Sequence, residues 1–149
     1  MEQNRCISLL GSTGSIGRQS LDVIAACGMR VAALTANRDV EQMEKQCRRF
    51  RPELAVMMDP ESAASLRLRL ADTPIRVAEG MEGLLEAASL EAADTVLTAV
   101  VGIVGLRPTL AAIRAGKRIA LANKETLVCA GELVSDAAAW SGSQVVPVD

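Results

Sequence analysis

Three glycines spaced three residues apart, Gly11, Gly14 and Gly17, follow the first apolar run of the chain. That run, residues 5–10, and the amphipathic segment after Gly17 predict a strand, a tight loop and a helix. Glycines let the backbone of such a loop approach a phosphate closely, because no side chain stands in the way. The unpaired N–H groups and partial positive charge at the start of the helix favour a pyrophosphate at this place.

The spacing of the loop is G-x-x-G-x-x-G, whereas the commoner dinucleotide-binding spacing is G-x-G-x-x-G. Its context strengthens the prediction, because a second apolar run at residues 29–35 completes a strand–helix–strand unit. Thr13 and Ser15 add hydroxyl donors to the loop. The sequence therefore favours a bound nucleotide, and the alternative is a tight turn that binds nothing.

Composition limits the classes of protein to which this chain can belong. Its 149 residues suit one domain, and half of them are hydrophobic although aromatic residues make up only 1%. A net charge of −2 and the scarcity of aromatic rings argue against a nucleic-acid partner. The chain has no histidine, so catalysis on it would need Lys, Asp, Glu, Cys, a cofactor or a metal with oxygen ligands.

Cysteine usage and hydropathy indicate where such a chain works. Cys6, Cys27, Cys47 and Cys129 form no C-x-x-C pair, so we expect them to be small buried hydrophobic residues in a reducing compartment. The sequence shows no basic leader before a long apolar stretch and no apolar run that would span a bilayer. We expect a soluble, cytoplasmic protein without a membrane partner.

Apolar runs alternate strictly with amphipathic segments along the whole chain, which predicts a Rossmann-like, doubly wound α/β fold. We expect a mainly parallel sheet of about seven strands with helices on both faces. The expected strands are residues 5–10, 30–35, 54–58, 75–78, 95–100, 118–121 and 145–148. The expected helices are residues 16–26, 40–50, 60–71, 80–90, 108–115 and 125–140.

The second expected strand ends at Asn37, Arg38 and Asp39. In dinucleotide-binding folds this place meets the adenosine ribose, where an acidic side chain favours the 2′-hydroxyl of NAD and a cation favours the 2′-phosphate of NADP. Arg38 lies closest to that place and Asp39 one step beyond it, which favours NADP. In the alternative interpretation, Arg38 is a solvated side chain and Asp39 is the N-cap of the next helix.

A second polar cluster, Asn123, Lys124 and Glu125, emerges from the expected strand at residues 118–121. The carboxyl edge of an open α/β sheet is where ligands bind, so Lys124 is a candidate to hold a substrate phosphate or enolate. The alternative is an ordinary helix start with Asn123 as its N-cap. Asp149, which follows the last expected strand, would lie at the same edge.

Four segments together resemble the 1-deoxy-D-xylulose 5-phosphate reductoisomerase family: LGSTGSIG at 10–17, LRPTLAAI at 106–113, LANKETLV at 121–128 and PVD at 147–149. The resemblance implies that residues 1–149 are an NADPH-binding domain, with the catalytic and C-terminal domains outside this chain. Such enzymes isomerise and reduce 1-deoxy-D-xylulose 5-phosphate to 2-C-methyl-D-erythritol 4-phosphate in isoprenoid biosynthesis. They use NADPH with Mg²⁺ or Mn²⁺, and the resemblance also implies a cytoplasmic homodimer.

The resemblance assigns roles by position. It implies pyrophosphate contacts at Thr13, Gly14, Ser15 and Ile16, and ribose and 2′-phosphate contacts at Asn37, Arg38 and Asp39. It further implies NADPH contacts at Asn123 and Glu125, substrate binding and catalysis at Lys124, and a metal ligand at Asp149.

One segment departs from the family pattern. The family often has Gly-Lys-Asn where this chain has Asn37-Arg38-Asp39, which keeps the cation but adds a carboxylate. Residues 1–149 alone are expected to be inactive. The alternatives from other classes are a non-catalytic NAD(P)-sensing module and the first domain of another NADP oxidoreductase, such as an aspartate-semialdehyde dehydrogenase.

Overall fold

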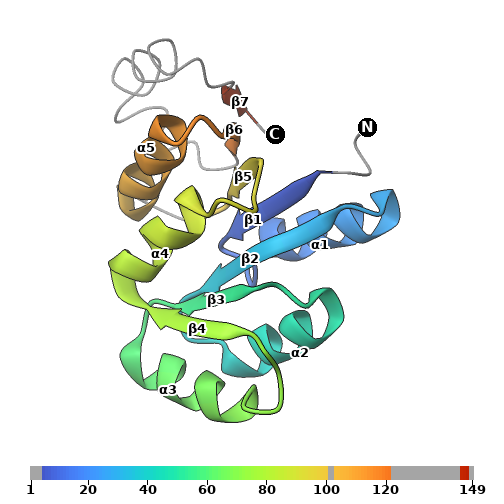
Figure 1. Cartoon of the computed structure of the whole chain (residues 1–149), viewed down its shortest axis with the longest axis vertical. Helices are drawn as coiled ribbons and strands as arrows, with labels where there is room; N and C mark the ends of the chain where they lie inside the picture. The colour runs from blue at the N-terminus through green and yellow to red at the C-terminus, as the bar shows by residue number, and fades with distance from the viewer. Residues whose placement is uncertain (1–4, 101–102, 122–144, 148–149) are drawn as a thin grey trace.

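A computed structural model describes residues 5–100, 103–121 and 145–147 of the chain (Figure 1). Seven strands form one sheet in the order β4-β3-β2-β1-β5-β6-β7, and all neighbouring strands run parallel. The strands are β1 (Cys6–Leu10), β2 (Arg30–Ala36), β3 (Leu54–Met57), β4 (Arg76–Glu79), β5 (Thr95–Thr98), β6 (Arg118–Leu121) and β7 (Val145–Pro147). The described α-helices are α1 (Ser15–Cys27), α2 (Val40–Phe50), α3 (Pro60–Arg69), α4 (Gly80–Ser89) and α5 (Leu106–Arg114), and a short 3₁₀ turn, η2 (Ile103–Gly105), precedes α5.

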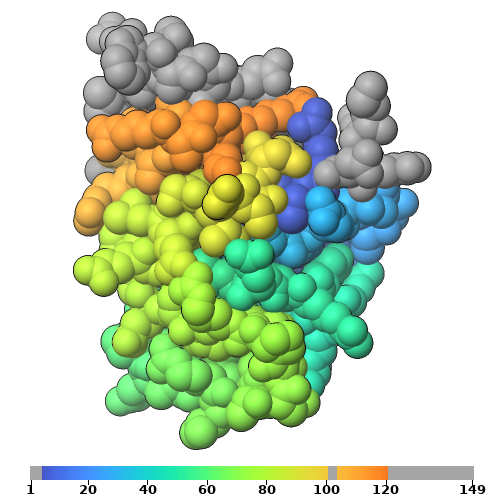
Figure 2. Space-filling view, viewed as in Figure 1, coloured from blue at the N-terminus to red at the C-terminus, as the bar shows by residue number. Residues whose placement is uncertain are grey.

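Successive side chains of each strand point to opposite faces of the sheet, and helices cover both faces. On one face, Leu9 and Leu34 pack with side chains of α1, α2 and α3 in a common buried cluster. On the other face, Leu10 and Val96 pack with side chains of α4 and α5. These two helices contact each other and form one continuous surface in the space-filling view (Figure 2). The predicted doubly wound parallel sheet is confirmed.

Local sequence signals set the ends of several helices. Gly28 takes the left-handed conformation with a φ of 69° and ends α1. Asp39 and Asp59 cap α2 and α3, each by accepting a hydrogen bond from a main-chain N–H three residues on. Pro60 occupies the first turn of α3, where its missing N–H costs nothing.

The boundaries of a few elements differ from those expected. The strand expected at 95–100 ends at Thr98, and the helix expected from residue 108 begins two residues earlier, at Leu106. The helix expected at 60–71 ends at Arg69, and the strand expected at 75–78 is Arg76–Glu79. The helix expected at 125–140 lies outside the described residues. None of the described helices is long and apolar enough to cross a membrane.

The expectation that the cysteines are buried is wrong for Cys27. Cys6 and Cys47 are buried, but Cys27 is exposed at the last residue of α1. The buried residues of α1 are Gly17, Leu21 and Ile24, so its last turn places Cys27 on the solvent side of the helix. Cys129 lies outside the described residues.

Candidate functional site

The glycine loop between β1 and α1 is hydrogen-bonded to the end of β2. The main-chain N–H groups of Gly11 and Ser12 both donate to the carbonyl oxygen of Thr35, at 3.1 and 2.7 Å. The N–H of Gly11 also lies 2.9 Å from the hydroxyl oxygen of Thr35. The loop therefore has a fixed position at the carboxyl edge of the sheet, where parallel α/β sheets bind their ligands.

Close packing explains two of the three loop glycines. A Cβ at Gly17 would clash with the carbonyl oxygen of Gly11 and lie 2.8 Å from Ser12 Cα. Gly11 has a φ of 87°, and a Cβ there would lie 2.9 Å from the carbonyl oxygen of Ala99. Gly14 differs, because a Cβ at this position would meet nothing within 4 Å. Protein packing therefore requires Gly11 and Gly17, whereas the space beside Gly14 is open.

A cleft of about 340 Å³ opens beside Gly14 at this edge of the sheet. It lies between the ends of β1, β2 and β5 and combines main-chain groups of the glycine loop with apolar walls. Its lining residues are Gly11, Thr13, Gly14, Thr35, Ala36, Asn37, Met58, Leu84, Ala99, Val100 and Val104. The structure thus brings Thr13, Gly14 and Asn37, three of the predicted binding residues, to one cleft.

The start of α1 differs from the starts of α2 and α3. Gly14 is its N-cap and offers no side chain to the first N–H groups of the helix, whereas Asp39 and Asp59 cap the other two helices. Ser15 and Ile16, in the first turn of α1, are exposed. Uncapped N–H groups at a helix start favour an anion, so the first turn of α1 fits a phosphate group of a ligand.

The residues predicted for the ribose end, Asn37, Arg38 and Asp39, are all exposed. The carboxylate of Asp39 accepts a hydrogen bond of 3.1 Å from the N–H of Gln42, so the alternative interpretation of Asp39 as a helix cap is confirmed. Near Arg38, hydrogen bonds from Ser62 and, to a smaller extent, the charge of Arg38 hold the pKa of Asp59 below its usual range. Arg38 is therefore followed in the chain by one acidic residue, Asp39, and interacts electrostatically with a second, Asp59.

Gln46 on α2 was not predicted as part of the site. Its side chain is only 5% exposed, and its amide nitrogen donates a buried hydrogen bond of 2.9 Å to the carbonyl oxygen of Ser12. Gln46 lies three residues after Met43 and one before Cys47, both fully buried. A polar residue at a core-facing position of a helix was therefore the signal that could have identified it.

The other predicted site residues, Asn123, Lys124, Glu125 and Asp149, lie outside the described residues. The strand that leads into the first three is present, because β6 pairs with β5 along Thr95–Thr98. Across residues 5–100, 103–121 and 145–147, no group of three or more Cys, Asp or Glu side chains could hold a metal ion. The described part of the chain therefore supplies a cleft at the carboxyl edge of the sheet, and its Cys, Asp and Glu side chains form no group that could hold a metal ion.

Comparison with known proteins gives a consistent result. A sequence profile of the family described as 1-deoxy-D-xylulose 5-phosphate reductoisomerase matches residues 7–131. The reductoisomerase of Agathobacter rectalis is 52% identical over 144 residues, and that of Moorella thermoacetica is 54% identical over 145. Each alignment covers 96% of this chain but 38% of the relative, so the chain spans well under half the length of the proteins that it matches.

Solved structures agree with the sequence comparison. The Zymomonas mobilis reductoisomerase in complex with NADPH superimposes with a TM-score of 0.93 at 43% identity, covering 98% of this chain and 39% of that one. A reductoisomerase in complex with NADPH, fosmidomycin and magnesium gives a TM-score of 0.91 at 41% identity, covering 96% and 36%. The homoserine dehydrogenase of S. aureus, at 19% identity, a TM-score of 0.56 and coverage of 97% and 32%, shares the fold alone.

Proposed function

Because the chain belongs to the 1-deoxy-D-xylulose 5-phosphate reductoisomerase family, we propose that it is the NADPH-binding part of an enzyme with this activity. Residues 1–149 would form one Rossmann-like domain, and the catalytic and C-terminal domains would lie outside it. The 38% coverage of the relatives supports this division. The solved relative that holds NADPH supports the choice of cofactor.

The open space beside Gly14 carries the proposal. A Cβ at Gly11 or Gly17 would clash with the main chain, which accounts for these two glycines, whereas a Cβ at Gly14 would meet nothing within 4 Å and Gly14 borders the cleft. A dinucleotide pyrophosphate fits this place, because the uncapped first turn of α1 supplies N–H donors and the positive end of the helix. The apolar wall formed by Met58, Leu84 and Val104 suits the flat face of a base.

Within the cleft, Thr13, Gly14, Ser15 and Ile16 would hold the pyrophosphate through main-chain N–H groups and hydroxyls. Asn37, Arg38 and Asp39 would bind the ribose and its 2′-phosphate. Asn123 and Glu125 would fix the nicotinamide half of NADPH. Lys124 would bind the phosphorylated substrate and place it for reduction.

The complete enzyme would convert 1-deoxy-D-xylulose 5-phosphate to 2-C-methyl-D-erythritol 4-phosphate in isoprenoid biosynthesis. NADPH, when bound, supplies the hydride. The residues of this chain bind and orient the cofactor, and Asp149 would contribute one oxygen ligand to a Mg²⁺ or Mn²⁺ site completed outside this chain. Alone, the chain would bind NADPH without turnover.

Two further properties belong to the proposal. The complete protein would be a cytoplasmic homodimer, with no nucleic-acid or membrane partner. The alternative of another NADP oxidoreductase, such as an aspartate-semialdehyde dehydrogenase, is not favoured, because the family profile and the relatives named above are reductoisomerases.

Calorimetric titration of the full-length protein with NADPH and NADH tests the cofactor, with Arg38→Ala as the variant. We expect wild-type protein to prefer NADPH and the variant to lose about tenfold or more in NADPH affinity with little change for NADH. Equal affinity for both cofactors in the wild type would contradict an NADPH site.

A second variant, Lys124→Ala, separates an enzyme from an NAD(P)-sensing module. Loss of most of the turnover rate with NADPH binding retained is the result expected of an enzyme. An unchanged turnover rate would remove Lys124 from the catalytic site, and a wild-type protein without turnover would favour the sensor.

A further inference from the structure

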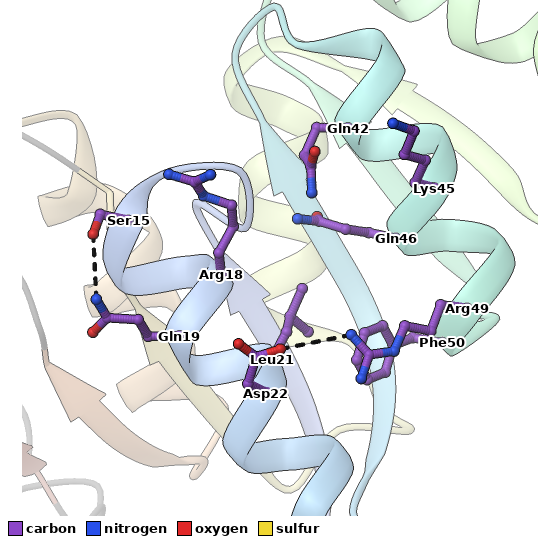
Figure 3. A pocket seen from close by; sticks show the side chains of 10 residues that line it. All are labelled: Ser15, Arg18, Gln19, Leu21, Asp22, Gln42, Lys45, Gln46, Arg49 and Phe50. Carbon is purple, nitrogen blue, oxygen red and sulfur yellow. Dashed lines mark hydrogen bonds and ion pairs between the residues drawn. The ribbon is translucent and has the colours of Figure 1, made fainter.

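A second cavity, of about 430 Å³, lies between α1 and α2 and adjoins the glycine loop (Figure 3). Ser15, which follows the cleft residue Gly14 directly, borders it at the start of α1. Most of its lining side chains are polar or charged. They are Ser15, Arg18, Gln19, Leu21, Asp22, Gln42, Lys45, Gln46, Arg49 and Phe50.

The charges in this cavity are unevenly paired. Asp22, the one acid of the lining, lies 3.7 Å from Arg49, whose guanidinium also stacks 4.8 Å from the ring of Phe50. In the described part of the chain, no carboxylate lies within ion-pair distance of Arg18 or Lys45. The cavity therefore offers two cations without an acidic partner, which suits an anionic ligand.

Arg18 lies at the end of the cavity nearest the glycine loop. Its Nε is 3.4 Å from the carbonyl oxygen of Gly14, and Figure 3 shows its guanidinium at the level of Ser15 and Gln42, at the opposite end from Asp22 and Arg49. The main-chain N–H of Gln42 in turn donates a hydrogen bond to the carboxylate of Asp39, the N-cap of α2. Arg18 thus faces the space between the first turns of α1 and α2, which the ribose of the proposed cofactor would border.

The floor of this space is also polar. Gln46 points into the gap between the two helices in Figure 3, and its amide nitrogen donates a hydrogen bond to the carbonyl oxygen of Ser12. Its amide oxygen is buried and has no hydrogen-bond partner among the described residues. A buried acceptor without a partner is rare in proteins, and a polar ligand, or the water that it brings, would satisfy it.

The residues at the end of β2 do not by themselves favour a phosphate. Arg38 carries one positive charge, but the acidic residue Asp39 follows it directly in the chain, and the charge of Arg38 also acts on the carboxyl group of Asp59. A phosphate monoester carries about −1.5 to −2 charges at neutral pH, so a second cation beside Arg38 is needed to balance the charge of a bound phosphate. Arg18 has no ion-pair partner among the described residues and its Nε lies 3.4 Å from the carbonyl oxygen of Gly14 in the glycine loop. A guanidinium can bind a phosphate through two parallel hydrogen bonds.

We propose that Arg18 binds the 2′-phosphate of the cofactor from the α1 side, opposite Arg38, and determines the preference for NADPH over NADH. This inference rests on the proposed NADPH-binding function. In this arrangement the 2′-phosphate lies between the two guanidinium groups, at the mouth of the cavity between α1 and α2.

The test uses two ligands that differ only in the 2′-phosphate, adenosine 2′,5′-bisphosphate and adenosine 5′-monophosphate. Each is titrated into full-length wild-type protein and into Arg18→Gln, Arg18→Lys and Arg49→Gln. We expect Arg18→Gln to lower the affinity for adenosine 2′,5′-bisphosphate by about tenfold or more and to leave the affinity for adenosine 5′-monophosphate unchanged. Arg18→Lys should recover part of the loss, and Arg49→Gln, at the far end of the cavity, should match the wild type.

Three other outcomes are informative. A bisphosphate affinity unchanged by Arg18→Gln, with the preference lost in Arg38→Ala, would overturn the role of Arg18 and leave the NADPH site standing. An equal loss of affinity for both ligands would also overturn the role of Arg18, because such a loss would indicate a disturbed glycine loop. A wild-type protein that does not distinguish the two ligands would instead remove the proposed NADPH function itself.

Discussion

The amide nitrogen of Gln46 on α2 lies 2.9 Å from the main-chain oxygen of Ser12 and donates a hydrogen bond to it. This bond joins two segments that are 34 residues apart, and it is buried. The hydroxyl of Ser12 adds a weak contact of 3.9 Å to the sulfur of Met43, also on α2. Since the same loop leads into α1, the position of the glycine loop depends on α2.

Replacement of Gln46 by leucine should therefore destabilise the protein and weaken its affinity for NADPH. The substitution leaves the carbonyl oxygen of Ser12 without its donor, which costs about 1 to 3 kcal/mol of unfolding free energy. Urea unfolding and NADPH titration measure the two effects. Gln42→Leu is the matched control, because the structure shows no side-chain hydrogen bond from Gln42 to a described residue. Equal stability of the two variants would contradict the anchoring role of Gln46.

Alanine substitutions at Gly14 and Gly17 should separate binding from folding. Gly17→Ala forces a Cβ against Gly11 and Ser12, so we expect a loss of about 2 kcal/mol or more in stability. Gly14→Ala adds its methyl group to open space at an ordinary φ of −76° and should leave the melting temperature unchanged while reducing NADPH affinity. Thermal melts without NADPH measure the stability of each variant, and the shift of the melting temperature on addition of NADPH measures its cofactor binding. An NADPH affinity unaffected by Gly14→Ala would show that no ligand approaches this glycine.

The N-cap of α3 predicts a dependence of stability on acidic pH. Hydrogen bonds from the hydroxyl and main-chain N–H of Ser62, with the charge of Arg38, hold the pKa of Asp59 below its usual range. A lowered pKa in the folded state means that ionised Asp59 stabilises the protein above about pH 4, and that this contribution is lost as the pH falls through the lower folded value. The stability difference between wild type and Asp59→Asn should therefore shrink below pH 4.

An NMR titration of the Asp59 carboxyl group checks this cause directly. Ser62→Ala removes the hydroxyl that lies 2.8 Å from the carboxylate but keeps the main-chain donor. We expect the pKa of Asp59 to rise in this variant and to remain below that of an unfolded aspartate. A pKa unaffected by Ser62→Ala would assign the shift to other groups.

Thiol reactivity should distinguish the described cysteines. Burial raises the pKa of Cys47 to about 12, and burial also raises the pKa of Cys6, so both thiols stay protonated at pH 8. Cys27 is exposed. Iodoacetamide at pH 8 should modify Cys27 in the native protein, and Cys6 and Cys47 only after denaturant is added. Peptide mapping of a Cys129→Ser variant measures this order, and rapid native modification of Cys47 would contradict its burial.

The order of the strands and helices was predictable because its signals are local. The helix expected at residues 40–50 has the observed bounds of α2, in which Val40, Met43, Cys47 and Phe50 form an apolar stripe with helical spacing. The strand expected at residues 118–121 has the bounds of β6. Local residue types also fix helix ends, because Gly28 takes the left-handed conformation that ends α1, and Asp59 with Pro60 begins α3. In each case a few neighbouring residues determine the backbone conformation.

Features that depend on distant segments were missed or misjudged. The partner of Gln46 lies on another element, and the apolar wall of the cleft combines Met58, Leu84 and Val104 from three parts of the chain. The exposure of Cys27 depends on which face of α1 packs against the sheet, which composition does not reveal. The roles of Asn123, Lys124, Glu125 and Asp149 stay predictions.

The central position of β1 has a consequence for the newborn chain. Its partner on one side, β2, leaves the ribosome soon after it, but its partner on the other side, β5, begins only at Thr95. At usual synthesis rates, the residues between β1 and β5 take roughly 4 to 17 s to synthesise. Until Thr95–Thr98 has been synthesised, the main-chain N–H and C=O groups on that edge of β1 lack their β5 partners. An unpaired strand edge can pair with the sheets of other molecules, so the delay between β1 and β5 is a period in which the growing chain can aggregate.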